Sequence, residues 1–90
     1  MTFAELNNLF CDGEDAYLDR KDSRQAITCF GSVISEAINY SDDQQMRELA
    51  IDAYYYIGTL HNDADEYVWE EASELMERYG DHIECLRNMK

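Results

Sequence analysis

Proline is absent from this ninety-residue sequence, and glycine occurs only four times. Both residues interrupt helices, so their scarcity predicts long α-helices joined by short turns. No apolar run reaches the roughly 18 residues of a membrane-spanning helix, and the N-terminus lacks the basic-then-apolar order of a signal peptide. We therefore expect a single all-α domain over residues 1–90, located in the cytoplasm and without a membrane partner.

Basic residues are also scarce. Seven Lys and Arg residues stand against 20 Asp and Glu residues, which gives a formal net charge of −13. Such a chain is repelled by nucleic acid and by anionic membranes, which excludes direct binding to either through bulk attraction. Two explanations of the excess charge stay open: it keeps the protein soluble, or it attracts a partner with a basic surface.

The sequence offers little material for catalysis or cofactor binding. Its three cysteines, Cys11, Cys29 and Cys85, are odd in number and form no C-x-x-C motif, which predicts reduced, buried thiols. No Cys–His arrangement and no glycine-rich phosphate loop is evident. A calcium-loop-like start at Asp63 fails inside the loop, where a tyrosine and a valine replace an oxygen ligand and a glycine. We expect no enzyme activity, no metal and no cofactor.

Capping boxes mark the expected helix starts, because a Ser, Thr or Asp followed three residues later by Glu or Gln satisfies free backbone N–H groups. They occur at Thr2, Asp22, Ser41 and Asp63. Apolar residues recur at helical spacing after each box, and the first helix runs to about Arg20. The short turns predict two antiparallel hairpins that stack. Gly80 is expected to end the fourth helix in a left-handed conformation, with a short C-terminal helix after it.

The first hairpin carries an aromatic residue early in its first helix and another near the end of that helix. A small residue then opens the second helix, and an aromatic residue follows one turn later. These residues are Phe10, Tyr17, Ala26 and Phe30. Residues 7–40 thus resemble one tetratricopeptide repeat, a helix–turn–helix unit of about 34 residues. The sequence departs from that family at Glu14, which takes the usual glycine position with Gly13 one residue early, and in its missing proline.

A second unit centres on the stretch YYYIGTLH, in which Tyr54, Ile57 and Gly58 keep the family spacing W-x-x-L-G. Ala72 and Met76 stand for the alanine and the aromatic residue of its second helix, two residues late. The resemblance implies stacked hairpins that present a groove or a helix face to a peptide or a protein domain. It also implies that Gly58 lets a neighbouring helix approach closely; the alternative is a glycine that is merely tolerated.

The three consecutive tyrosines differ in their expected exposure. On a helical wheel Tyr54 and Tyr56 flank the apolar face, so we expect them to be half-buried with their hydroxyls in water. Tyr55 points away from that face, and it is either an ordinary exposed residue or an anchor for a partner. Trp69 on the fourth helix is a second candidate anchor.

Acidic side chains form stripes on two of the expected helices. The residues are Glu66, Glu70, Glu74 and Glu77 on the fourth helix, and Glu5, Asp12, Asp15 and Asp19 on the first. Like charges one turn apart destabilise a helix by a few tenths of a kcal/mol per pair, so helix stability alone does not explain the stripes. Their spacing of about 6 Å is similar to that of phosphates along one nucleic-acid strand. The simpler interpretation is that the stripes are solvated helix faces. The more specific interpretation is that they form a surface that mimics nucleic acid.

Two functions stay open on the sequence alone. The first is a non-enzymatic protein–protein interaction module that binds a partner with a basic surface through Tyr55, Trp69 or apolar residues near the C-terminus. The second is a small acidic inhibitor that mimics nucleic acid and blocks a basic nucleic-acid-binding site. Chains of this kind are similar in bulk properties to phage anti-CRISPR and anti-restriction proteins. The apolar residues Ile83, Leu86 and Met89 either cap the stack or seal a homodimer.

Overall fold

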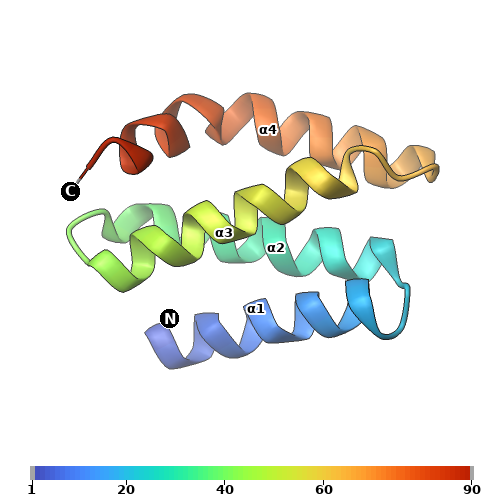
Figure 1. The fold of residues 1–90 in the computed structure, drawn as a ribbon, viewed down its shortest axis with the longest axis horizontal. Coiled ribbons are helices and arrows are strands. Elements are labelled where there is room, and N and C mark those ends of the chain that lie inside the picture. Colours follow the sequence, from blue (N-terminus) through green and yellow to red (C-terminus); the bar gives the residue numbers. More distant parts are fainter. Residues whose placement is uncertain (1, 90) are drawn as a thin grey trace.

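The computed structural model describes residues 2–89, and α-helices dominate that part of the chain (Figure 1). The elements are α1 (Phe3–Leu18), α2 (Ser23–Ala37), the short 3-10 helix η1 (Ile38–Tyr40), α3 (Gln44–Leu60) and α4 (Glu66–Arg87). No β-strand occurs within residues 2–89. Successive helices run in opposite directions and form two hairpins, α1–α2 and α3–α4, which pack on each other. The expected all-α fold of stacked antiparallel hairpins is confirmed.

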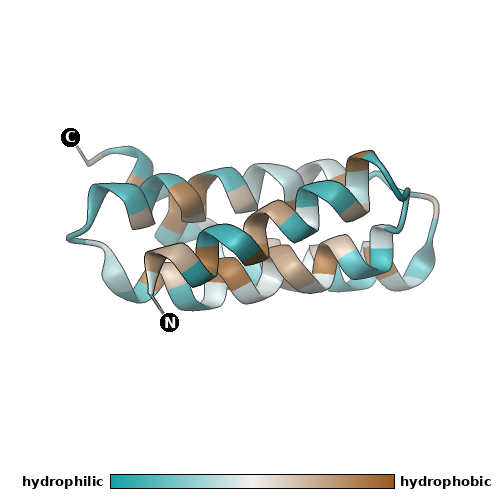
Figure 2. Ribbon diagram, turned by 90° about the horizontal axis from the view of Figure 1, so that it is seen from below, coloured by the Kyte–Doolittle hydropathy of each residue, from teal (hydrophilic) through white to brown (hydrophobic). Residues whose placement is uncertain are grey.

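The two central helices hold the stack together. Helix α2 packs against α1, α3 and α4, and α3 packs against α2, α4 and α1. Helices α1 and α4 therefore form the two outer edges of the stack, with α2 and α3 between them (Figure 1). Hydrophobic and hydrophilic residues alternate around each helix at helical spacing (Figure 2), so every helix contributes one face to a common core. The largest fully buried side chain is Phe30 on α2.

The helix starts follow the sequence signals closely at two of four places. Thr2 forms the predicted capping box with Glu5, and Asp22 accepts the backbone N–H of Gln25. The other two helices begin two residues later than expected, because Asp43 and Asp65 are the N-caps. Each aspartate accepts two backbone N–H groups at the start of its helix, which satisfies two of the free donors at once.

The end of α4 differs from the expectation. The short separate C-terminal helix is absent as an independent element, because α4 runs without interruption through Gly80 to Arg87. Gly80 does not adopt a left-handed conformation. A Cβ atom at Gly80 would lie 3.2 Å from the hydroxyl of Tyr54, so the glycine leaves room for that side chain. Continuing the helix buries Ile83 and Leu86 in the core, whereas Met89 stays exposed.

The first turn also differs in detail. Helix α1 ends at Leu18, two residues before Arg20, and Lys21 adopts a left-handed conformation with a φ of 56°. The N–H of Asp22 then donates to the carbonyl oxygen of Ala16 at 2.7 Å, which satisfies one of the free carbonyls at the helix end.

Close helix packing occurs at Gly13 on α1. A Cβ atom there would lie 2.9 Å from Cε1 of Phe30 and 3.1 Å from Cβ of Cys29, so the absence of a side chain lets α1 and α2 approach this closely. The expectation that Gly58 has this role is wrong. A Cβ atom at Gly58 would have no neighbour within 4 Å outside its own helix backbone. The position faces a hollow in the surface and not another helix.

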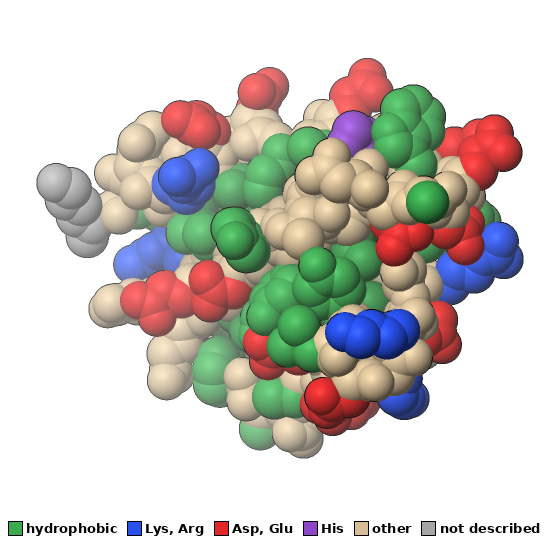
Figure 3. All heavy atoms as spheres, turned by 45° about the vertical axis from the view of Figure 1, so that its right-hand side comes forward, with side chains coloured by type: hydrophobic (Ala, Val, Ile, Leu, Met, Phe, Trp, Pro, Cys, Tyr) green, Lys and Arg blue, Asp and Glu red, His purple; other side chains and the backbone are tan. Residues whose placement is uncertain are grey.

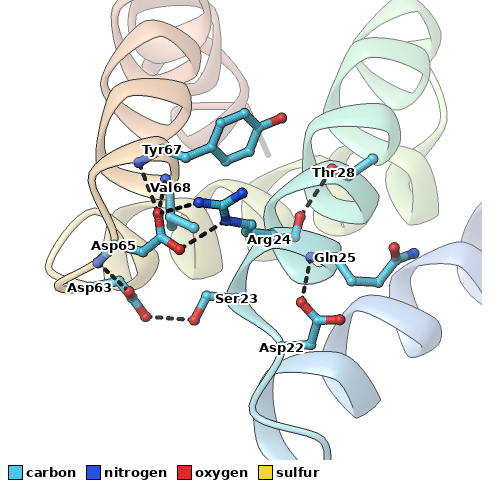
Figure 4. Close-up of polar contacts among 9 residues, drawn as sticks. All are labelled: Asp22, Ser23, Arg24, Gln25, Thr28, Asp63, Asp65, Tyr67 and Val68. Atoms are coloured by element: carbon cyan, nitrogen blue, oxygen red, sulfur yellow. Dashed lines mark hydrogen bonds and ion pairs between the residues drawn. The ribbon is translucent and has the colours of Figure 1, made fainter.

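A polar cluster connects the two hairpins at one end of the stack (Figure 4). Arg24 at the start of α2 forms an ion pair with Asp65, the N-cap of α4, with 2.9 Å between Nε and Oδ2. Its guanidinium lies over the ring of Tyr67, 4.9 Å from the ring centre. The hydroxyl of Ser23 donates to Asp63. The ion pair holds the pKa of Asp65 below its usual value, and because the pair is exposed we expect it to fix register more than stability.

Candidate functional site

Four aromatic rings pack together where α1, α2 and α3 meet. The rings of Phe30 and Tyr56 stack in parallel with 4.6 Å between their centres. Phe10 contacts both rings edge-on, 5.5 Å from Phe30 and 5.7 Å from Tyr56, and Tyr17 lies 5.8 Å from Tyr56. This cluster attaches α3 to the first hairpin. It makes α3 a rigid platform for whatever its outer side presents.

Tyr56 is half-buried as expected, and its hydroxyl donates to the Glu14 carboxylate on α1 at 2.7 Å. That bond, together with burial and the negative charges of Glu14 and Asp52, raises the pKa of Tyr56 to about 12. Burial and the nearby carboxylates of Glu48 and Glu14 also raise the pKa of Asp52. Among residues 2–89, the carboxylates of Glu14, Glu48 and Asp52 form no ion pair. The α1–α3 side of the stack therefore carries uncompensated negative charge.

Replacing Tyr56 by phenylalanine is expected to destabilise the protein by roughly 1–2 kcal/mol at neutral pH, because Glu14 loses its donor. The fold favours the neutral phenol, since the pKa of Tyr56 is higher in the folded protein than in the unfolded chain. The stabilisation is thus complete below about pH 10 and is lost as the pH rises toward 12. Urea unfolding across this range should show the wild type and the variant converging.

A gap between the two that stays constant or widens above about pH 10 would contradict this assignment. The matched control is Tyr55→Phe, which removes a hydroxyl from the neighbouring exposed ring and is expected to leave stability unchanged.

Tyr55 stands on the outer side of α3 between two hollows. Its side chain is 71% exposed, the largest value among the exposed hydrophobic residues of the described chain. One hollow, of about 490 Å³, lies between α3 and α4. The other, of about 250 Å³, lies between α1 and α3. Tyr55 and Asp52 each line both hollows. The predicted exposure of Tyr55 is confirmed, and the structure adds the hollows that the sequence did not indicate.

Trp69 is half-exposed and stacks on His61, with 5.4 Å between the ring centres. His61 Nε2 lies 2.9 Å from Ser73 Oγ. A nucleophilic serine needs a histidine oriented by a third group and donors for an oxyanion. Within residues 2–89 His61 has no carboxylate partner, and its ring is fixed against Trp69 instead. The group is therefore interpreted as a structural contact between the end of α3 and the start of α4.

The acidic stripes lie on the outer edges of the stack. All predicted stripe residues are exposed. The stripe that follows α1 and the stripe on α4 are separated by α2 and α3 (Figure 1), so the structure does not bring the two stripes together. On the face in Figure 3, hydrophobic side chains gather near the middle and acidic ones lie mostly toward the edge. Within the described chain Glu74 alone among the stripe residues is ion-paired, with Arg78 at 2.6 Å.

The remaining reactive side chains are dispersed. Cys11 and Cys85 are exposed and only Cys29 is buried, so the expectation of three buried thiols is wrong for two of them. No group of three or more His, Cys, Asp or Glu side chains suited to a metal ion occurs in residues 2–89. In the same part of the chain, no helix combines the length and the apolar character needed to cross a membrane.

We compared the chain with protein family models, with curated proteins and with solved structures, and none of the three comparisons found a match. Support for a function therefore comes from the fold and the surface of this chain.

Proposed function

We propose that this protein is a non-enzymatic interaction module that binds a partner protein with a basic surface through the outer side of α3, with Tyr55 as its anchor. We further propose that its two hairpins stack as tetratricopeptide-like repeats. The packing order, in which α2 contacts both helices of the next hairpin, supports this arrangement.

The exposure of Tyr55 is the observation that carries the proposal. Tyrosine is enriched at the energetic centres of protein interfaces, because it combines a large apolar ring with a polar tip and few rotatable bonds. This ring is 71% exposed, and its side of α3 is flanked by two hollows that offer room for partner side chains. Helix α3 is held on its inner side by the aromatic cluster, so the ring is presented from a rigid element.

The charge around Tyr55 supports a basic partner. Asp52 and Glu14 line the α1–α3 hollow, and Glu48 lies close enough to raise the pKa of Asp52. No Lys or Arg of residues 2–89 pairs with them. A Lys or Arg of the partner would gain a carboxylate and the face of an aromatic ring in the same place. The net charge of −13 would also accelerate its approach.

A second candidate is the acidic inhibitor that mimics nucleic acid. The exposed and mostly unpaired stripe on α4 favours it, because those carboxylates are free to meet Lys and Arg residues of a nucleic-acid-binding site. It predicts binding that depends on Glu66, Glu70 and Glu74 and falls steeply with salt.

The experiment captures partners from lysate and then measures the affinity of the purified partner for variants. Tyr55→Ala is expected to weaken binding by about thirtyfold or more, since interface anchors contribute about 2 kcal/mol or more. The matched control is Tyr40→Ala, which removes a ring that is 42% exposed in η1, outside α3. Both substitutions are at exposed positions and should leave the fold intact.

Two results would overturn the interaction module. One is an unchanged affinity of Tyr55→Ala. The other is complete loss of binding in the triple variant Glu66→Lys, Glu70→Lys and Glu74→Lys, combined with full binding by Tyr55→Ala. That pattern would establish the mimic instead.

A further inference from the structure

In the tetratricopeptide-like arrangement proposed above, α3 takes in the second hairpin the place that α1 takes in the first. Residues Phe10, Glu14 and Tyr17 correspond to Tyr54, Gly58 and His61, each 44 residues later in the chain (10 to 54, 14 to 58, 17 to 61). The α1 residues all contact Tyr56 of α3, through ring contacts from Phe10 and Tyr17 and a hydrogen bond from Tyr56 to Glu14. This flank of α1 therefore receives the first helix of the following hairpin.

The corresponding flank of α3 borders an open groove. We call this the α3–α4 groove, and it is the hollow of about 490 Å³ beside Tyr55. Its apolar lining comes from Ile51, Tyr54, Tyr55, Gly58 and Ile83. Ile83 is almost fully buried and forms part of the floor, while Arg87 and Asp52 stand at its margin. If the two hairpins stack as the proposed repeats, the first helix of a third hairpin would pack in this groove.

We infer that the α3–α4 groove binds an amphipathic helix of the partner protein, with an apolar stripe against Tyr54 and Gly58 and Lys or Arg residues beside that stripe. This inference rests on the proposed function and names the kind of segment that occupies one side of the Tyr55 surface. The bound helix would take the place on α3 that α3 itself takes on α1.

Gly58 explains why the occupant is a helix. A Cβ atom at this position would meet nothing within 4 Å outside its own helix, and glycine in a helix interior destabilises it by roughly 1 kcal/mol relative to alanine. No contact among residues 2–89 requires that residue. A helix backbone lying in the groove would approach α3 most closely at this position, because the residue has no side chain. Gly13 shows the same principle between α1 and α2.

Charge explains why the occupant is a basic partner and not a second copy of this chain. Two copies would each bring a net charge of −13 to the interface. The margin of the groove includes Asp52, and the carboxylates of Glu48 and Glu14 lie close enough to raise the pKa of Asp52 further. Arg87 is the one basic residue in the lining of the groove. Lys and Arg residues on the bound helix would neutralise this margin.

The test uses a synthetic peptide of about 15 residues, long enough to form a helix on binding, with leucines at i, i+3, i+4 and i+7 and lysines elsewhere. A control peptide has the same composition in scrambled order, so it carries equal charge but no helical apolar face. Fluorescence anisotropy measures both affinities at moderate salt. The helical peptide is expected to bind at least about tenfold more tightly than the control peptide.

The decisive variant is Gly58→Leu, which fills the groove from its floor. The variant is expected to have a higher melting temperature than the wild type, because leucine is a better helix former than glycine. Its affinity for the helical peptide is expected to be at least about tenfold lower. The matched control is Ser32→Leu, at an exposed position on α2 in the hollow between α2 and α4. That variant should bind the peptide like the wild type.

The inference is overturned if the two peptides bind equally, since the attraction is then charge alone, or if Gly58→Leu keeps full affinity. A dimer of the wild type that Gly58→Leu abolishes, seen by analytical ultracentrifugation, would assign the groove to a second copy instead. Failure of the groove inference can be distinguished from failure of the proposed function. If the captured partner loses affinity for Tyr55→Ala and keeps it for Gly58→Leu, the interaction module stands and the groove inference fails.

Discussion

Replacing Phe30 by alanine is expected to lower the free energy of unfolding by about 3–5 kcal/mol, which is a large part of the stability of a domain this size. Phe30 is fully buried, and its ring stacks on Tyr56 and meets Phe10 edge-on. The substitution removes the apolar contacts of the ring and leaves a cavity that three rigid helices cannot close. Urea unfolding followed by circular dichroism measures the loss.

Phe3→Ala is the matched control for this variant. Phe3 lies in the first turn of α1 and is only partly buried. Phe3→Ala is therefore expected to lower the free energy of unfolding clearly less than Phe30→Ala does. A loss below about 1.5 kcal/mol for Phe30→Ala would contradict the position of the aromatic cluster at the centre of the fold.

Replacing Gly13 by valine is expected to destabilise the protein by about 2–3 kcal/mol, although glycine is a poor helix former. The new Cβ would lie 2.9 Å from the Phe30 ring and 3.1 Å from Cβ of Cys29, and the ring is held in place by its stacking on Tyr56. The clash must move α1 away from α2 or tilt the ring. Thermal and urea unfolding measure the change.

Gly58→Ala is the matched control, because it makes the same kind of change at a helix position with open space around it. It is expected to stabilise the protein by up to about 1 kcal/mol, so the two glycines should respond with opposite signs. Equal responses would show that the helices are not packed as described.

The helical fold follows from local signals in the sequence. Missing proline, apolar residues at helical spacing and the capping boxes at Thr2 and Asp22 are each readable along one short segment, and the structure agrees with them. The second pair of helix starts shows the limit of such signals. Several acceptors compete at Ser41 to Asp43 and at Asp63 to Asp65, and the residue that accepts two N–H groups becomes the cap in each case.

The roles of the glycines could not be predicted from local signals. Whether Gly13, Gly58 or Gly80 lies at a close contact depends on which helices face it, and that is decided by tertiary packing. The sequence favoured Gly58 for close packing and Gly80 for a helix end, but the structure gives the close contact to Gly13 and continues α4 through Gly80. Tertiary packing overrides the helix-breaking tendency of Gly80 because Ile83 and Leu86 reach the core.

The candidate site was predicted in part. Helical geometry alone places Tyr55 away from the core, and this was readable from the sequence. The partner of Tyr56 was not, because Glu14 lies 42 residues away on α1 and no local pattern connects the two. The hollows beside Tyr55 arise only when three helices come together, so they too required the structure.

The measurement that tests the central claim most directly is NMR mapping of amide chemical shifts in the labelled protein on addition of the captured partner. The largest changes are predicted along the outer side of α3, at Ile51, Tyr55 and Gly58, and across the groove at Ile83 of α4. Changes concentrated instead on the acidic stripe of α4 from Glu66 to Glu77, with α3 unaffected, would contradict the claim that this protein binds its partner through the surface around Tyr55.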